Sequence, residues 1–148
     1  MDLKENTKQV FQQVTKAVQE TGREDGSVSV IAVTKYVDIA TAANLIDQGV
    51  KHIGENRVDK FLEKYHALSD KDVTWHLIGS LQRRKVKDVI PFVDYFHALD
   101  SLKLAQEIQK RTNRTVKCFL QVNISGEESK HGFSKEELLT VLQDLSSL

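Results

Sequence analysis

Disulfides, metal clusters and membrane spans have little support in this sequence. Of 148 residues only Cys118 is a cysteine, which excludes an internal disulfide, and no Cys or His pairs stand at the spacing of a zinc motif. The segment 1–20 mixes charged and polar residues, so it predicts neither a signal peptide nor a membrane-spanning helix. We therefore expect a cytoplasmic protein that does not enter the membrane.

An excess of either charge is also absent. Lys and Arg total 21 and Asp and Glu total 21, so the formal net charge is zero and no global field recruits nucleic acid. Hydrophobic residues make up 40% and charged residues 28%, an ordinary balance for a globular domain. We expect a single domain over residues 1–148, although a complete β/α barrel has roughly 250 residues.

A repeat of strands and helices follows a leading helix at 6–20. Strands are expected to start at residues 27, 51, 73, 95 and 116, which gives steps of 24, 22, 22 and 21 residues. Such alternation predicts parallel strands with right-handed crossovers. A doubly wound sheet and a barrel both fit, but no G-x-G-x-x-G follows the first strand, which disfavours a dinucleotide-binding fold. The expected strands are 27–33, 51–54, 73–78, 95–99 and 116–124.

The end of the first expected strand carries the sharpest candidate residue, Lys35. A lysine after a buried apolar run either extends to solvent or loses hydration. A neutral amine is what attack on an aldehyde requires, and that attack begins a Schiff base. By position alone, a solvated strand-end lysine is the commoner interpretation.

Other polar side chains at the strand ends have ordinary alternatives. Asn56 could bind a ligand hydroxyl, or it could cap the helix that follows. The strand histidines are more typical of satisfied structural residues than of catalytic bases, and we nominate none as a base. These histidines are His52, His76 and His97. The run Arg83, Arg84 and Lys85 could face an anion, but such a run on a helix is more typical of a solvated face.

Core packing is the expected role of three other side chains. Trp75 and Phe119 are predicted to be core residues, and Cys118 a small core hydrophobe.

The last helix should begin at a capping box formed by Ser134 and Glu137. Pro91 should mark the end of the helix before the fourth strand.

Five segments at these strand ends resemble the pyridoxal-phosphate homeostasis protein family, whose barrel is that of the N-terminal domain of alanine racemase. The segments read IAVTK (31–35), HIGENRV (52–58), WHLIGSLQRRK (75–85), HALDS (97–101) and QVNISGEESKHGF (121–133). They occur in order, at the period of the repeat. Ser80 departs from the family, where histidine is common after Ile-Gly. The resemblance implies a (β/α)8 TIM barrel of the alanine racemase N-terminal type, here a leading helix plus the first five β/α units.

The same resemblance implies that the chain binds pyridoxal 5′-phosphate. Lys35 matches the lysine that holds this cofactor as a Schiff base, and Asn56 matches a residue that lines its pocket. The family pattern also places the phosphate-binding loops after the last two strands, beyond residue 148. Lys130 is a second possible amine, but a solvated lysine should remain protonated.

The implied role is cofactor homeostasis and carriage, with delivery to pyridoxal-phosphate-dependent apoenzymes and a monomeric full-length protein. Racemisation needs two bases, and only Lys35 can be nominated. Weak racemase or lyase activity is the first alternative, and a non-catalytic protein-interaction module is the second.

Overall fold

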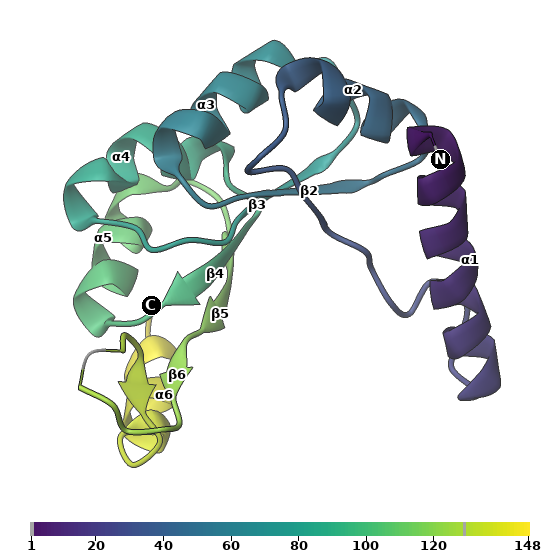
Figure 1. Ribbon diagram of the computed structural model, residues 1–148. Coiled ribbons are helices and arrows are strands. Elements are labelled where there is room, and N and C mark those ends of the chain that lie inside the picture. The colour runs from purple at the N-terminus through teal and green to yellow at the C-terminus, as the bar shows by residue number, and fades with distance from the viewer. Residues whose placement is uncertain (1, 129) are drawn as a thin grey trace.

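A curved, all-parallel sheet forms the centre of the computed structural model, which describes residues 2–128 and 130–148 (Figure 1). Its strands follow one another in sequence order, β1-β2-β3-β4-β5. The strands are β1 (Ala32–Val33), β2 (His52–Glu55), β3 (Thr74–Leu77), β4 (Tyr95–Leu99) and β5 (Lys117–Leu120). A doubly wound sheet would reverse its order partway, so this order is that of the first five strands of a β/α barrel.

Helices lie along the convex side of the sheet in Figure 1, while α1 stands apart beside α2. The helices are α1 (Leu3–Glu20), α2 (Ile39–Asp47), α3 (Val58–Ala67), α4 (Val86–Val89), α5 (Leu102–Arg111) and α6 (Leu138–Leu145), with 3-10 turns η1 (Arg83–Lys85) and η2 (Ile90–Phe92). Pro91 lies in η2, at the end of the third β/α connection, as predicted. Among the described residues, no helix combines the length and the apolar character needed to cross a membrane.

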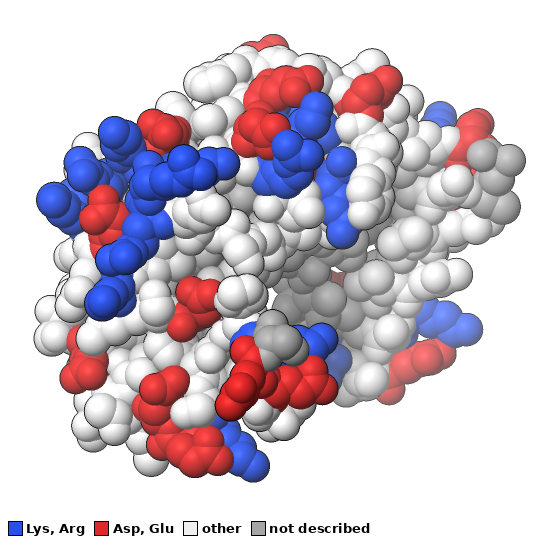
Figure 2. Space-filling model, turned by 60° about the vertical axis from the view of Figure 1, so that its left-hand side comes forward, with Lys and Arg blue, Asp and Glu red and all other residues white. Residues whose placement is uncertain are grey.

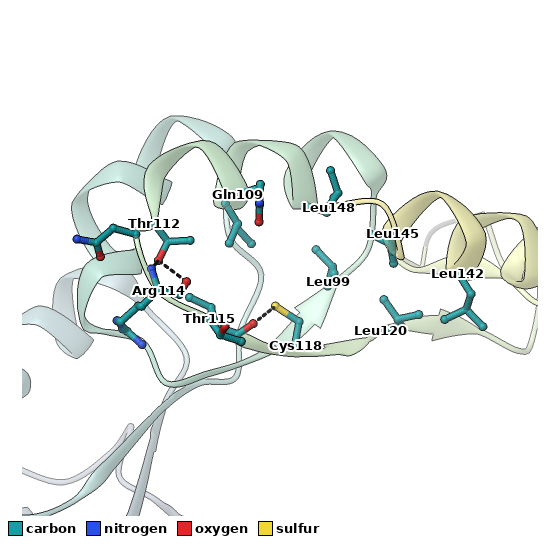
Figure 3. A pocket seen from close by; sticks show the side chains of 14 residues that line it. Leu99, Gln109, Thr112, Arg114, Thr115, Cys118, Leu120, Leu142, Leu145 and Leu148 are labelled. Atoms are coloured by element: carbon teal, nitrogen blue, oxygen red, sulfur yellow. Dashed lines mark hydrogen bonds between the residues drawn. The ribbon is translucent and has the colours of Figure 1, made fainter.

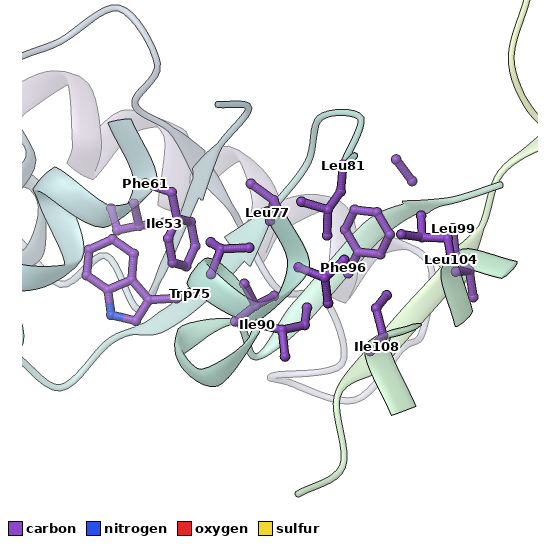
Figure 4. Packing of buried hydrophobic residues seen from close by; sticks show 14 of the residues in the cluster. Ile53, Phe61, Trp75, Leu77, Leu81, Ile90, Phe96, Leu99, Leu104 and Ile108 are labelled. Carbon is purple, nitrogen blue, oxygen red and sulfur yellow. The ribbon is translucent and has the colours of Figure 1, made fainter. Parts of the chain in front are cut away.

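The main core lies between the sheet and these helices (Figure 4). Ile53, Leu77 and Phe96 project from three strands and are fully buried against Phe61 of α3 and Ile90. Trp75 is 3% exposed and packs edge-on against Phe61, so its predicted core position is confirmed. Because strand side chains alternate, the residues between these core positions face the concave side of the sheet.

Three expected strands are shorter than the sequence indicated, the one at 73–78 by a single residue at each end and two others by more. The segment 27–33 forms a ladder only at Ala32 and Val33, which pair with Ile53 and Gly54 of β2, its one partner strand among the described residues. The segment 116–124 is divided at Gln121, whose backbone bonds to Leu99 on one side and Phe133 on the other. The chain then leaves the main sheet as β6 (Val122–Asn123), which pairs with β7 (Phe133–Ser134).

The predicted capping box is present at the last helix. The Ser134 backbone N–H donates to Glu137 Oε1 over 2.8 Å, and the Glu137 N–H donates to Ser134 Oγ over 3.2 Å. Regular α-helix begins only at Leu138, so the box closes the turn that leads into α6.

Candidate functional site

Lys35 follows the buried Thr34 at the C-terminal end of β1 and is exposed to solvent. Its ammonium lies 5.0 Å from the centre of the Tyr36 ring. Across residues 2–128 and 130–148, no carboxylate lies within ion-pair distance of it. The structure thus places Lys35 in solvent rather than in a desolvated pocket, with its amine unengaged by acidic groups.

Asn56 follows β2 next to the point where Lys35 follows β1. The Thr34 N–H donates to the Gly54 carbonyl over 3.0 Å, and Thr34 also bonds to Glu55, so the residues after each strand leave the sheet as neighbours. The N-cap of α3 is Arg57, which makes no side-chain cap bond. The alternative interpretation of Asn56 as the helix cap is therefore wrong.

The backbone of Asn56 also passes close to the end of β3. A Cβ atom at Gly79, just beyond β3, would collide with the Asn56 carbonyl oxygen. Only glycine lets these two backbone segments approach so closely. Three consecutive strand ends, carrying Lys35, Asn56 and Gly79, thus meet at one rim of the sheet.

A buried polar network lies directly behind Lys35. Lys64, on α3, donates to Glu55 Oε2 over 3.0 Å and also to the Thr34 carbonyl, while the Thr34 hydroxyl donates to the same carboxylate oxygen. The side chains of Lys64 and Glu55 are 5% and 0% exposed. The other carboxylate oxygen, Glu55 Oε1, is buried with no hydrogen-bond partner among the described residues.

This network was not predicted from the sequence, although the pattern of apolar residues contains a signal for it. Lys64 lies three residues after Phe61 and four before Leu68, on the apolar stripe of its helix. A lysine on that stripe needs a buried partner. Glu55 lies two residues after Ile53 in β2, so both side chains point to the face of the sheet that the helices cover. Lys64 and Glu55 could therefore have been predicted to meet between α3 and the sheet.

The Lys35 side chain lines a surface hollow of about 520 Å³ between the start of α2 and the face of α3. Lys60, Glu63 and Lys64 line its α3 side, while Asn56 does not line it. Asp38 caps α2 here by accepting from the Thr41 N–H over 2.8 Å. Hydrogen bonds from Thr41 hold the pKa of Asp38 below its ordinary value.

Three histidines form a row across the concave face of the sheet. His52 Nδ1 lies 2.9 Å from His76 Nε2, and His76 Nδ1 lies 2.8 Å from His97 Nε2. Burial, then the charges of His97 and His52, lower the pKa of His76 to about 4, and burial lowers that of His97. His76 is thus bonded through both of its ring nitrogens, as is typical of a structural histidine.

Two predicted core residues of β5 are not in the core. Phe119 is 54% exposed on the concave face, where its ring lies 4.8 Å from that of His97. Cys118 is also exposed, on the opposite face of β5. Both predictions were wrong, because the described residues cover the two faces of β5 only in part at these positions.

Cys118 lines the hollow shown in Figure 3, of about 750 Å³, between β5, α5 and α6. Its walls combine apolar side chains, among them Leu99, Leu120 and Leu142, with polar ones from the segment 112–115. They remove part of the hydration of the thiol and so raise the pKa of Cys118. This hollow shares no lining residue with the one at Lys35, so it is separate from the predicted site.

Charges of both signs are intermixed on the surface. Figure 2 shows acidic and basic side chains interspersed over one face, with a group of basic side chains at one edge. Arg83, Arg84 and Lys85 are all exposed in η1, so their predicted solvated position is confirmed.

Comparisons with known proteins agree with the fold. The family model described as the alanine racemase N-terminal domain matches residues 6–148. A pyridoxal phosphate homeostasis protein of Aquifex aeolicus is 38% identical over 141 residues, covering 93% of this chain and 62% of that protein. An unknown protein from Bifidobacterium adolescentis superposes with a TM-score of 0.84 at 33% identity, covering 98% of this chain and 64% of the other.

A second similar structure contains a cofactor. PipY of Synechococcus elongatus, solved with pyridoxal phosphate bound, has a TM-score of 0.77 at 32% identity, covering 89% of this chain and 63% of that one. The present chain thus spans 62–64% of the length of these three relatives. The predicted resemblance and the barrel-type fold are both confirmed.

Proposed function

The chain belongs to the alanine racemase N-terminal domain family, and on that premise we propose that it binds pyridoxal 5′-phosphate covalently through the amine of Lys35. The observation that carries this proposal is the position of Lys35. It follows the C-terminal end of β1, where β/α barrels place functional side chains. Its amine has no acidic partner among the described residues, so no ion pair must break before it reacts.

The neighbouring side chains fit the cofactor as well. Pyridoxal phosphate, when bound, supplies an aldehyde that reacts with a lysine amine. Asn56 leaves β2 beside Lys35, and its amide makes no hydrogen bond to other described residues. We assign Asn56 to hydrogen bonding with a polar group of the bound cofactor. Gly79 keeps the Asn56 backbone in place at the same rim.

The proposed role is homeostasis and carriage of the cofactor in the cytoplasm, not turnover of an amino acid. PipY with pyridoxal phosphate bound and the homeostasis protein of Aquifex aeolicus support this choice. Pyridoxal-phosphate-dependent apoenzymes are the proposed recipients, and the full-length protein is proposed to act as a monomer. Amino-acid racemase or lyase activity is the alternative, since a lysine-bound cofactor is also the starting point of such enzymes.

A spectroscopic titration tests the proposal. The protein, in the full length that its gene encodes, is mixed with pyridoxal phosphate and compared with Lys35→Ala and with the matched control Lys60→Ala, whose amine lines the same hollow. In the wild type and in Lys60→Ala, we expect the absorbance of the bound cofactor to rise with added pyridoxal phosphate and then to saturate. In Lys35→Ala we expect this absorbance change to be lost. Equal absorbance in all three proteins would reject Lys35 as the site. Steady release of product from an added amino acid would favour the enzyme alternative.

A further inference from the structure

We propose that Thr34, Glu55 and Lys64 form a positioning network that fixes the backbone from which Lys35 projects. This inference rests on the proposed function, because the network is proposed to position Lys35 for reaction with the cofactor. None of the three side chains reaches the cofactor in this account; they act through the backbone of Thr34.

Thr34 is held at three atoms. Its N–H donates to the Gly54 carbonyl over 3.0 Å, and its hydroxyl donates to Glu55 Oε2. Its carbonyl accepts from Lys64 Nζ and from the Val37 N–H, the latter over 3.2 Å. The Val37 bond closes the turn that contains Lys35. The residue before Lys35 is thus tied to β2 and α3, and the residues after it are tied back to Thr34.

The placement of the charges indicates a purpose other than general stability. Glu55 and Thr34 are both 0% exposed, and Lys64 is 4% exposed. Replacing a buried ion pair by apolar residues of similar size is often neutral or stabilising, so stability alone is a weak reason for burying this one. The geometry that this pair imposes is that of the turn at Lys35.

Glu55→Gln removes the negative charge of Glu55 with little change in the shape of the side chain. It breaks no hydrogen bond at Oε1, which has no partner among the described residues. In Glu55→Gln the amide oxygen can accept from Thr34 and Lys64, while the amide NH2 occupies the place that has no partner. Combined with Lys64→Met, this variant is neutral and keeps the buried volume. The pair Thr34→Val and Thr34→Ser tests the hydroxyl separately, because only serine can still donate to Glu55.

Two readouts on the full-length protein test the proposal. The first is hydrogen exchange at the Val37 amide without cofactor, which reports the turn itself. The second is the rate at which pyridoxal phosphate is captured on Lys35, measured well below the unfolding temperature. We expect E55Q/K64M and Thr34→Val to lose Val37 protection and to slow capture by about tenfold or more, since small misplacements of reacting groups are costly. Thr34→Ser should restore both.

The outcomes separate the two proposals. If the wild type captures no cofactor on Lys35, the proposed function fails, whatever the exchange data show. If the wild type captures cofactor and E55Q/K64M captures it at the same rate, the positioning role is overturned. A lower unfolding temperature with unchanged capture and unchanged Val37 protection would also overturn it, because the network would then be only structural.

Discussion

Lys64 Nζ lies 3.0 Å from Glu55 Oε2, and this buried ion pair joins α3 to the end of β2. Removal of one partner leaves an uncompensated charge in the core, which typically costs about 3–5 kcal/mol. We expect Lys64→Met alone to lower the free energy of unfolding by about that amount. The double variant E55Q/K64M should lose much less, because no charge remains buried.

Chemical denaturation of Lys64→Met, Glu55→Gln and E55Q/K64M measures these losses in a double-mutant cycle. The matched control is Arg111→Met, which breaks the more exposed pair with Glu107 on α5 and should change stability by less than about 1 kcal/mol. Equal losses in Lys64→Met and the double variant would show that the Lys64–Glu55 pair makes no special contribution.

His76 should make the fold sensitive to mild acid. Its pKa is about 4 in the folded protein, against about 6.5 when unfolded, so the unfolded chain binds the extra proton between these values. The stabilisation is therefore complete above pH 6.5 and declines as the pH falls toward 4. We expect a loss of about 1–2 kcal/mol, below the full linkage value because the concave face is open to solvent.

Urea unfolding at pH 7 and pH 4.5 tests this dependence. In His76→Gln the loss between these two pH values should shrink by that amount, while His131→Gln, at an exposed loop residue, should behave as the wild type. An unchanged pH dependence in His76→Gln would mean that His76 does not carry the effect.

Gly79→Ala should damage the proposed site by displacing Asn56. Its new Cβ meets a backbone oxygen, which cannot move aside as a flexible side chain can. We expect a stability loss of about 1–3 kcal/mol and weaker cofactor binding. The control is Gly54→Ala, whose Cβ would lie 3.2 Å from a methyl group of Ile31. Differential scanning calorimetry and a cofactor titration measure the two effects, and equal results for the two alanines would contradict the account.

Sequence patterns predicted the barrel-type order of strands and helices because that order depends on periodicity. They were less successful where a strand's length or a side chain's burial depends on neighbouring elements that are distant in the sequence. The segment 27–33 is β-branched and apolar, yet only Ala32 and Val33 find a partner strand. Phe119 and Cys118 are residue types common in cores, but they lie on the last strand of the described sheet. The described residues leave both side chains exposed there.

The candidate site shows the same division. Lys35 and Asn56 could be nominated because each follows a predicted strand. The buried network behind Lys35 was harder to predict, because the hydrogen bond from Lys64 to the Thr34 carbonyl joins residues 30 positions apart. Such contacts are decided by how α3 packs on the sheet, which periodicity alone does not specify.

The most direct test of the central claim is to locate the attached cofactor. The full-length protein is saturated with pyridoxal phosphate, reduced with borohydride, digested and mapped by mass spectrometry. The account predicts one major adduct, on Lys35, that is absent from Lys35→Ala and retained in Lys60→Ala and Lys130→Ala. An adduct spread over Lys60, Lys130 and other exposed lysines, with none preferred at Lys35, would contradict it.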